Sequence, residues 1–105
     1  MQRFHNTCET HPHVTQLLDT KIYTRRRRMN ISQNALADQA GLTRNCIQQI
    51  ECHEHLPRLS TLFHLMKALQ FNAKESSRFM EELQTAYVMD KQLQRERDER
   101  LETIP

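Results

Sequence analysis

Residues Ser32 to Glu51 read SQNALADQAGLTRNCIQQIE, and this stretch predicts two short helices joined by a tight turn. Ser32 suits the capping position of a first helix over Gln33–Ala40, because its hydroxyl can accept a hydrogen bond from a free N–H group at the helix start. Gly41 follows, and glycine takes the left-handed conformation that ends a helix at little steric cost. The chain should therefore turn sharply at Gly41.

The second helix is predicted over Arg44 to about Cys52, with Thr43 as its cap. Helical spacing divides its side chains between two faces. The apolar face joins the preceding helix and turn in one cluster: Leu36, Ala40, Leu42, Ile47 and Ile50. The other face carries long hydrogen-bonding side chains: Arg44, Asn45, Gln48 and Gln49. A helix with a buried back and such a front is suited to reading DNA bases.

At these residues the chain resembles the phage-repressor and Cro-type helix-turn-helix family, also called the xenobiotic-response-element (XRE) family of bacterial regulators. The resemblance covers roughly residues 14–83 and rests on residue types at fixed spacing: Ile31-Ser32-Gln33, Ala37, Ala40-Gly41-Leu42-Thr43, Ile47, Ile50-Glu51, Pro57 and Thr61-Leu62. It implies an all-α fold, a lambda-repressor-like DNA-binding domain of five helices, here with an extended C-terminal helix.

The resemblance implies that residues matching Thr43, Arg44, Asn45 and Gln49 make much of the contact with bases, whereas the match of Gln48 more often faces the groove wall. Groove chemistry supports the same set. Arginine pairs with guanine, asparagine and glutamine suit adenine, and a threonine methyl group can touch thymine. We therefore expect all five side chains to be DNA base-reading residues.

Contacts with phosphate are expected from Gln33, at the positive end of its helix, and from Arg26 and Arg58. In the family, the residue matching Arg26 also pairs with the glutamate matching Glu51, and arginine can bind a carboxylate with two hydrogen bonds. For the other members of the run Arg25–Arg28, phosphate contact and simple solubility remain equally open.

The charge of the chain is distributed unevenly. Residues 14–60 contain seven Lys and Arg against four acidic residues, whereas residues 73–105 contain six against eight. The positive charge lies with the predicted reading helix, as a nucleic-acid partner requires, and the acidic half should face away from DNA. The chain has no apolar run long enough for a membrane span, and three cysteines without scaffold spacing fit a reducing cytoplasm.

The remaining helices follow from their end signals. One should begin near Pro12 or His13 and end at Asn30, and another should cover Leu59–Gln70. Asn72 and Glu75 have the spacing of a capping box for a last helix. No glycine or proline interrupts residues 73–104, and a helix of that length would outreach a domain of this size.

We accordingly divide the chain into a flexible N-terminal arm (1–13), a DNA-binding domain (14–83) and a C-terminal helical extension (84–105). The far end of the last helix either frays or packs on a partner through Tyr87, Met89 and Leu93. We favour a homodimer contact there.

Two groups of potential metal ligands occur: His5, Cys8, His11 and His13, and Cys46, Cys52, His53 and His55. The first group does not have a common zinc spacing, so we expect a polar arm there. In the second group we expect Cys46 to pack as a half-buried residue, and we expect no metal and no cofactor.

The most favoured function is sequence-specific double-stranded DNA binding by a homodimeric transcriptional regulator, with the helix over residues 44–52 in the major groove. The alternative is an antitoxin-like protein-interaction module whose C-terminal helix binds a partner protein. An enzyme is not expected, because the chain has no glycine-rich phosphate loop and no nucleophile–base pair in a pocket.

Overall fold

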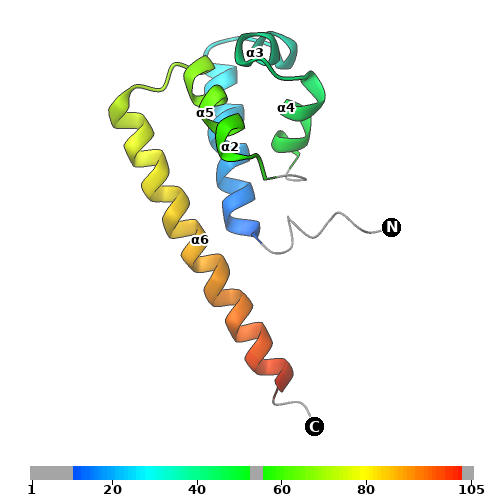
Figure 1. The fold of residues 1–105 in the computed structure, drawn as a ribbon, viewed down its shortest axis with the longest axis vertical. Coiled ribbons are helices and arrows are strands. Elements are labelled where there is room, and N and C mark those ends of the chain that lie inside the picture. Colours follow the sequence, from blue (N-terminus) through cyan, green and yellow to red (C-terminus); the bar gives the residue numbers. More distant parts are fainter. Residues whose placement is uncertain (1–10, 53–55, 103–105) are drawn as a thin grey trace.

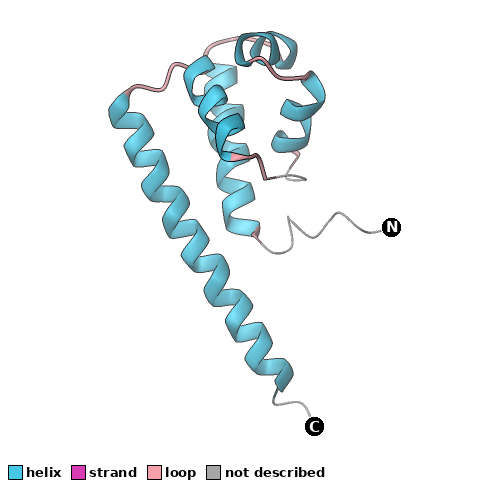
Figure 2. Cartoon of the chain, viewed as in Figure 1, coloured by secondary structure: helices cyan, strands magenta, loops and turns pink. Residues whose placement is uncertain are grey.

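The computed structural model describes residues 11–52 and 56–102 of the chain. These residues form five helices and no strand: α2 (Pro12–Arg28), α3 (Gln33–Ala40), α4 (Arg44–Glu51), α5 (Leu59–Ala68) and α6 (Ala73–Glu102) (Figure 2). The all-α prediction is therefore confirmed for the described part. Helices α3, α4 and α5 gather around one end of α2, while α6 runs along α2 and continues past it (Figure 1).

The turn between α3 and α4 has the predicted hydrogen bonds at its ends. The Ser32 hydroxyl accepts from the N–H of Ala35 at 3.0 Å, and the Thr43 hydroxyl accepts from the N–H of Cys46 at 3.1 Å. Gly41 lies between them with a φ of 70°. A Cβ atom added at Gly41 would meet nothing within 4 Å, so the positive φ is what calls for glycine there.

Two non-glycine residues also take the left-handed conformation. Asn30, with a φ of 60°, follows the end of α2 as predicted, and Gln70, with a φ of 61°, follows α5. The predicted helix over Leu59–Gln70 was therefore too long, since α5 ends at Ala68. No glycine or asparagine marked that end in the sequence.

The start of α6 has the predicted capping box. The N–H of Asn72 donates to Glu75 Oε1 at 3.0 Å, and the N–H of Glu75 donates back to Asn72 Oδ1 at 2.8 Å. From there α6 continues without a break to Glu102 and crosses the proposed boundary at residues 83 and 84. The C-terminal extension is thus the second half of a helix that begins in the domain.

The core has two apolar clusters. The first holds α3 and α4 on α2 and α5 and consists of Ile22, Leu36, Ala37, Ala40, Ile47, Ile50, Leu65 and Leu69. The second joins α2, α5 and α6 and consists of Leu18, Leu62, Met66 and Phe79. The apolar residues of the helix-turn-helix stretch thus lie where the sequence predicted, on its inner side.

Helices α2 and α6 run antiparallel and are joined by polar contacts along their length. Lys21 Nζ lies 3.1 Å from Glu82 Oε1 near the middle. At the start of α2, Asp90 accepts hydrogen bonds from the backbone N–H groups of His13 (3.0 Å) and Val14 (3.1 Å). A carboxylate from α6 therefore caps α2, whose own N-cap residue makes no side-chain cap.

Sequence reasoning missed this role of Asp90, which is 1% exposed. A signal was present: Asp90 continues the apolar row of Phe79, Leu83 and Ala86 at helical spacing, so a charge occupies a position that faces α2. A buried carboxylate needs hydrogen-bond donors, and a helix start supplies them.

Beyond Asp90, α6 projects past α2 for residues 91–102, most of which are exposed. At about 1.5 Å per residue this projecting portion is roughly 18 Å long. It helps explain a radius of gyration of 15.6 Å, against about 13 Å for a compact chain of 100 residues. None of the described helices is both long enough and apolar enough to cross a membrane.

Candidate nucleic-acid interface

Helix α4 presents one face to the core and the other to solvent. Ile47 and Ile50 are buried, whereas four of the predicted base-reading residues are exposed: Thr43, Arg44, Asn45 and Gln48. Gln49 is half-buried, because it lies at the edge of the polar arc, beside the buried side of the helix. Gln48, which the family pattern ranks lower, is the more accessible of the two glutamines.

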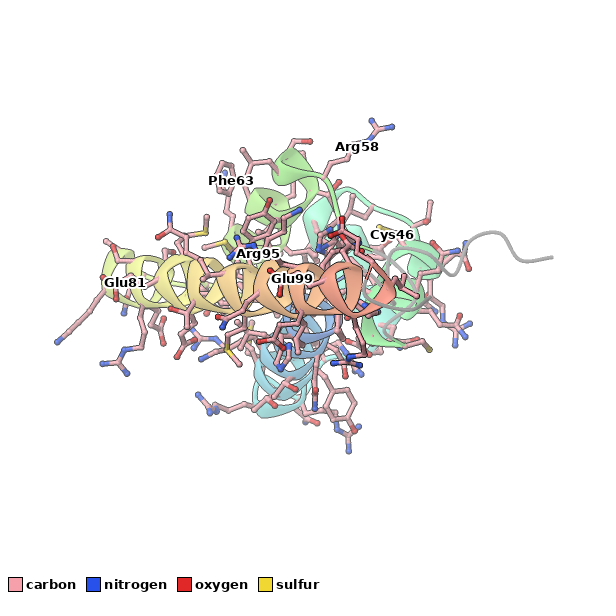
Figure 3. The ribbon with its side chains drawn as sticks, turned by 90° about the horizontal axis from the view of Figure 1, so that it is seen from below. Cys46, Arg58, Phe63, Glu81, Arg95 and Glu99 are labelled. Carbon is pink, nitrogen blue, oxygen red and sulfur yellow. The ribbon has the colours of Figure 1, made fainter. Side chains whose placement is uncertain are left out.

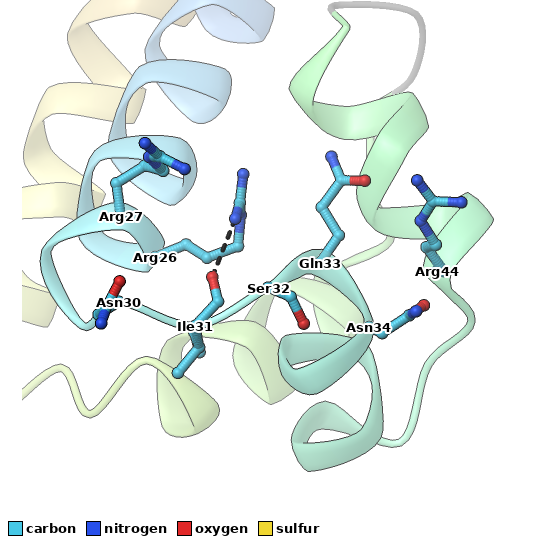
Figure 4. A pocket seen from close by; sticks show the side chains of 8 residues that line it. All are labelled: Arg26, Arg27, Asn30, Ile31, Ser32, Gln33, Asn34 and Arg44. Carbon is cyan, nitrogen blue, oxygen red and sulfur yellow. Dashed lines mark hydrogen bonds between the residues drawn. The ribbon is translucent and has the colours of Figure 1, made fainter.

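A cavity of about 550 Å³ lies between the end of α2 and the starts of α3 and α4. Its lining includes three arginines, Arg26, Arg27 and Arg44, together with Gln33 and Asn34, and it contains no carboxylate (Figure 4). The start of α3 adds backbone N–H groups and the positive end of the helix dipole. Charge and geometry both make this cavity suitable for an anion such as phosphate.

The Arg26–Glu51 ion pair predicted from the family is present. Arg26 Nε lies 2.8 Å from Glu51 Oε2, and Arg26 Nη2 lies 3.1 Å from Glu51 Oε1. A third bond runs from Arg26 Nη1 to the Ile31 carbonyl at 2.9 Å, and Gln33 Nε2 donates to Glu51 Oε1 at 2.9 Å. The network ties the end of α4 to α2 and to the start of α3.

This network changes what can be expected of the two predicted phosphate ligands. The Arg26 side chain is only 8% exposed, and three of its five N–H groups already have partners. Arg26 therefore acts mainly by holding α4 in place. The Gln33 side chain is also engaged with Glu51. Its backbone N–H, which has no partner within the helix because it lies in the first turn of α3, remains as a donor.

Arg25 neither contacts a phosphate site nor serves only solubility, the two roles that the sequence left open. Its guanidinium donates to both Glu75 oxygens, at 2.8 and 3.0 Å, and to the carbonyls of Leu69 and Gln70. Arg25 therefore neither faces the cavity nor serves as a freely solvated charge. It secures the end of α5 and the start of α6. The hydrogen bonds from the Arg25 guanidinium, with one from the Asn72 N–H, lower the pKa of Glu75 from 4.5 to about 2.

The remaining basic residues are distributed around the domain. Arg27 is exposed, lines the cavity and lies 5.9 Å from the ring centre of Tyr23. Arg28 is exposed and lies on the side of Glu75. Arg58 is exposed at the start of α5 and outside the cavity, and Figure 3 shows it projecting at the edge of the molecule. Arg27 lines the cavity, although the sequence analysis named Arg26 and Arg58 as the arginines that bind phosphate.

Within residues 11–52 and 56–102, no group of three or more potential metal ligands is found. His5, Cys8, His53 and His55 lie outside the described residues. His13 Nδ1 is 2.7 Å from Asp90. Cys46 packs against the core, and burial raises the pKa of its thiol.

Comparisons of the chain with known protein families, with curated proteins and with solved structures found no match. The resemblance to a helix-turn-helix family therefore rests on the residue pattern of the chain alone and stays a prediction.

Proposed function

We propose that this protein binds double-stranded DNA in a sequence-specific manner as a helix-turn-helix transcriptional regulator, with α4 entering the major groove. The observation behind the proposal is the junction of two surfaces. The exposed polar face of α4 adjoins a cavity lined by the exposed Arg27 and Arg44, beside the buried Arg26–Glu51 pair, and none of its lining residues is a carboxylate. One surface offers hydrogen bonds suited to base edges, and the other offers positive charge suited to the phosphates beside them.

In this function Arg44 pairs with guanine, and Asn45 and Gln48 read adenine edges. Arg27 and the start of α3 bind the flanking phosphates, while Arg26 and Glu51 set the angle at which α4 leaves the domain. One such module reads few base pairs, so we also propose a homodimer on two half-sites about one helical turn apart.

A second candidate is an antitoxin-like module that binds another protein through α6. Large apolar side chains of α6 that are about half-exposed favour it: Tyr87, Val88, Met89 and Leu93. Co-purification of a partner that is lost when α6 is truncated after Leu83 would support this function. It does not exclude DNA binding by the other end of the molecule.

The test compares base-reading and phosphate-binding residues on oligonucleotides selected from a random pool. Arg44→Ala should weaken binding to the preferred site by about 1–3 kcal/mol and relax the preference at particular base pairs. Arg27→Ala should weaken binding to all sequences and reduce the salt slope by about one. We choose Arg27 because truncating the buried Arg26 would also disturb the fold.

The matched control is Arg95→Ala, which removes the same charge from the exposed part of α6 and should leave DNA binding unchanged. An equal loss on every sequence from Arg44→Ala and Arg27→Ala would contradict the proposed division between reading and anchoring. Failure of the wild-type protein to enrich any sequence would contradict the function itself.

A further inference from the structure

An apolar groove lies on a side of the molecule that the proposed DNA interface does not use. It runs between α5 and α6, has a volume of about 650 Å³, and has Met66, Phe71 and Met80 in its lining. Phe71 is held there by its neighbours, since its ring lies 5.6 Å from that of Phe79 and beneath Arg25 at 4.9 Å. The groove is therefore a preformed feature of the domain.

One of the residues that line this groove is a large apolar side chain that also projects into solvent. Phe63, on the outer side of α5, is 49% exposed, and Figure 3 shows it standing clear of the ribbon. The same groove is bordered by opposite charges, Lys67 from α5 and Glu81 from α6. Neither side chain is part of an ion pair found among the described residues. The patch thus combines a projection, a recess and one charge of each sign.

We propose that this groove is the contact of a homodimer, in which Phe63 of each copy enters the groove of the other. A two-fold interface uses the same patch on both subunits, so that patch must be complementary to itself. The projection and the recess meet this requirement, and Lys67 of one copy can pair with Glu81 of the other on both sides of the axis. The choice of a second copy as the occupant rests on the proposed function, which calls for two reading helices.

The composition of the patch fits an interface. Aromatic residues and methionine are enriched at the centres of protein contacts, while charged residues remain at the rim. An aromatic side chain buries roughly 150–250 Å² when it is fully covered. Phe63 is 49% exposed, so each copy has about half of that area left to bury in the contact. This contact involves α5 and the first half of α6, whereas the sequence pointed to Tyr87, Met89 and Leu93 farther along α6.

The experiment measures molecular mass by sedimentation in the absence of DNA. Lys67→Glu would place two acidic side chains opposite each other across the axis, and Glu81→Lys would place two lysines there. Each variant alone should dimerise at least about tenfold more weakly than the wild type, because like charges face each other. An equimolar mixture should recover the dimer, since each mixed pair regains two attractive contacts.

Recovery of the dimer on mixing would show that Lys67 and Glu81 pair between copies. If they paired within one chain, mixing the two variants could not restore the pair. Phe63→Ser should also produce monomers without unfolding, because the side chain is on the surface. Leu93→Ser, a similar change at an exposed position on α6, should leave the dimer intact.

The proposal is overturned if the wild type is monomeric at all concentrations, if Phe63→Ser leaves the dimer unchanged, or if the mixture stays monomeric. Loss of the dimer in Leu93→Ser would likewise assign the contact to the end of α6. Arg44→Ala separates this proposal from the function above, because it should leave the dimer intact while changing DNA recognition.

Discussion

The two sides of α2 are held by neighbouring arginines with the same chemistry and very different burial. Arg26 forms an ion pair with Glu51 of α4, and the two side chains are 8% and 5% exposed. Arg25 forms an ion pair with Glu75 of α6, and the two side chains are 18% and 38% exposed. Each pair has two hydrogen bonds. Since the bond geometry of the two pairs is alike, we expect burial to decide how much the stability of the protein depends on each pair.

The largest effect is expected where a charge would be left buried. Glu51→Ala removes the carboxylate and leaves the Arg26 guanidinium without its counter-charge, so the free energy of unfolding should fall by about 3–5 kcal/mol. Urea denaturation measures this change.

The matched control replaces both partners, as Arg26→Met with Glu51→Leu, and should recover much of the loss because no unpaired buried charge remains. If Glu51→Ala lowers the free energy of unfolding by less than about 1 kcal/mol, the Arg26–Glu51 pair contributes no more than an exposed ion pair does, and the prediction is wrong.

A smaller loss of stability is expected where Asp90 of α6 meets the start of α2. Asp90→Ala leaves the N–H groups of His13 and Val14 without their acceptor, and should cost about 1–3 kcal/mol of unfolding free energy. Amide hydrogen exchange should also become faster at these two positions. Asp98→Ala, on the exposed part of α6, should change stability by less than about 0.5 kcal/mol. Equal effects from the two substitutions would show that Asp90 does not cap α2.

The smallest effect concerns the exposed pair and depends on pH. Because the contact with Arg25 lowers the pKa of Glu75 to about 2 in the folded protein, its stabilisation is present above about pH 4.5. It is lost as the pH falls from there toward 2. The difference in melting temperature between the wild type and Glu75→Gln should therefore shrink over this range. Glutamine keeps an acceptor for the Asn72 N–H, so the cap is retained. A difference that stays constant between pH 5 and pH 2 would contradict this assignment.

The helix ends could be predicted because their hydrogen bonds are local. Ser32 with Ala35, Thr43 with Cys46, and Asn72 with Glu75 are each three residues apart. Their residue types are recognisable without knowledge of the fold. Gln70 was missed because it carries no such signal, and its left-handed conformation ends α5 earlier than the periodicity indicates.

The roles of the basic run and of Asp90 could not be predicted in the same way. Arg25 meets Glu75 at a separation of 50 residues, and Asp90 meets His13 at a separation of 77. Which arginine faces which helix depends on the angle at which α2 crosses α4 and α6. The Arg26–Glu51 pair was predicted through a family resemblance, since spacing along the chain does not reveal it.

The amino-acid sequence by itself determined where the helices start, which side of each is apolar, and that polar side chains gather on the front of α4. Capping residue types and helical spacing are properties of residues close together in the chain, so they can be recognised from the sequence alone. The tertiary structure alone decided that Arg25 serves α6, that Asp90 caps α2, and that a groove opens beside Phe63. These features arise only when distant helices meet, because burial and partners depend on what packs against each side chain.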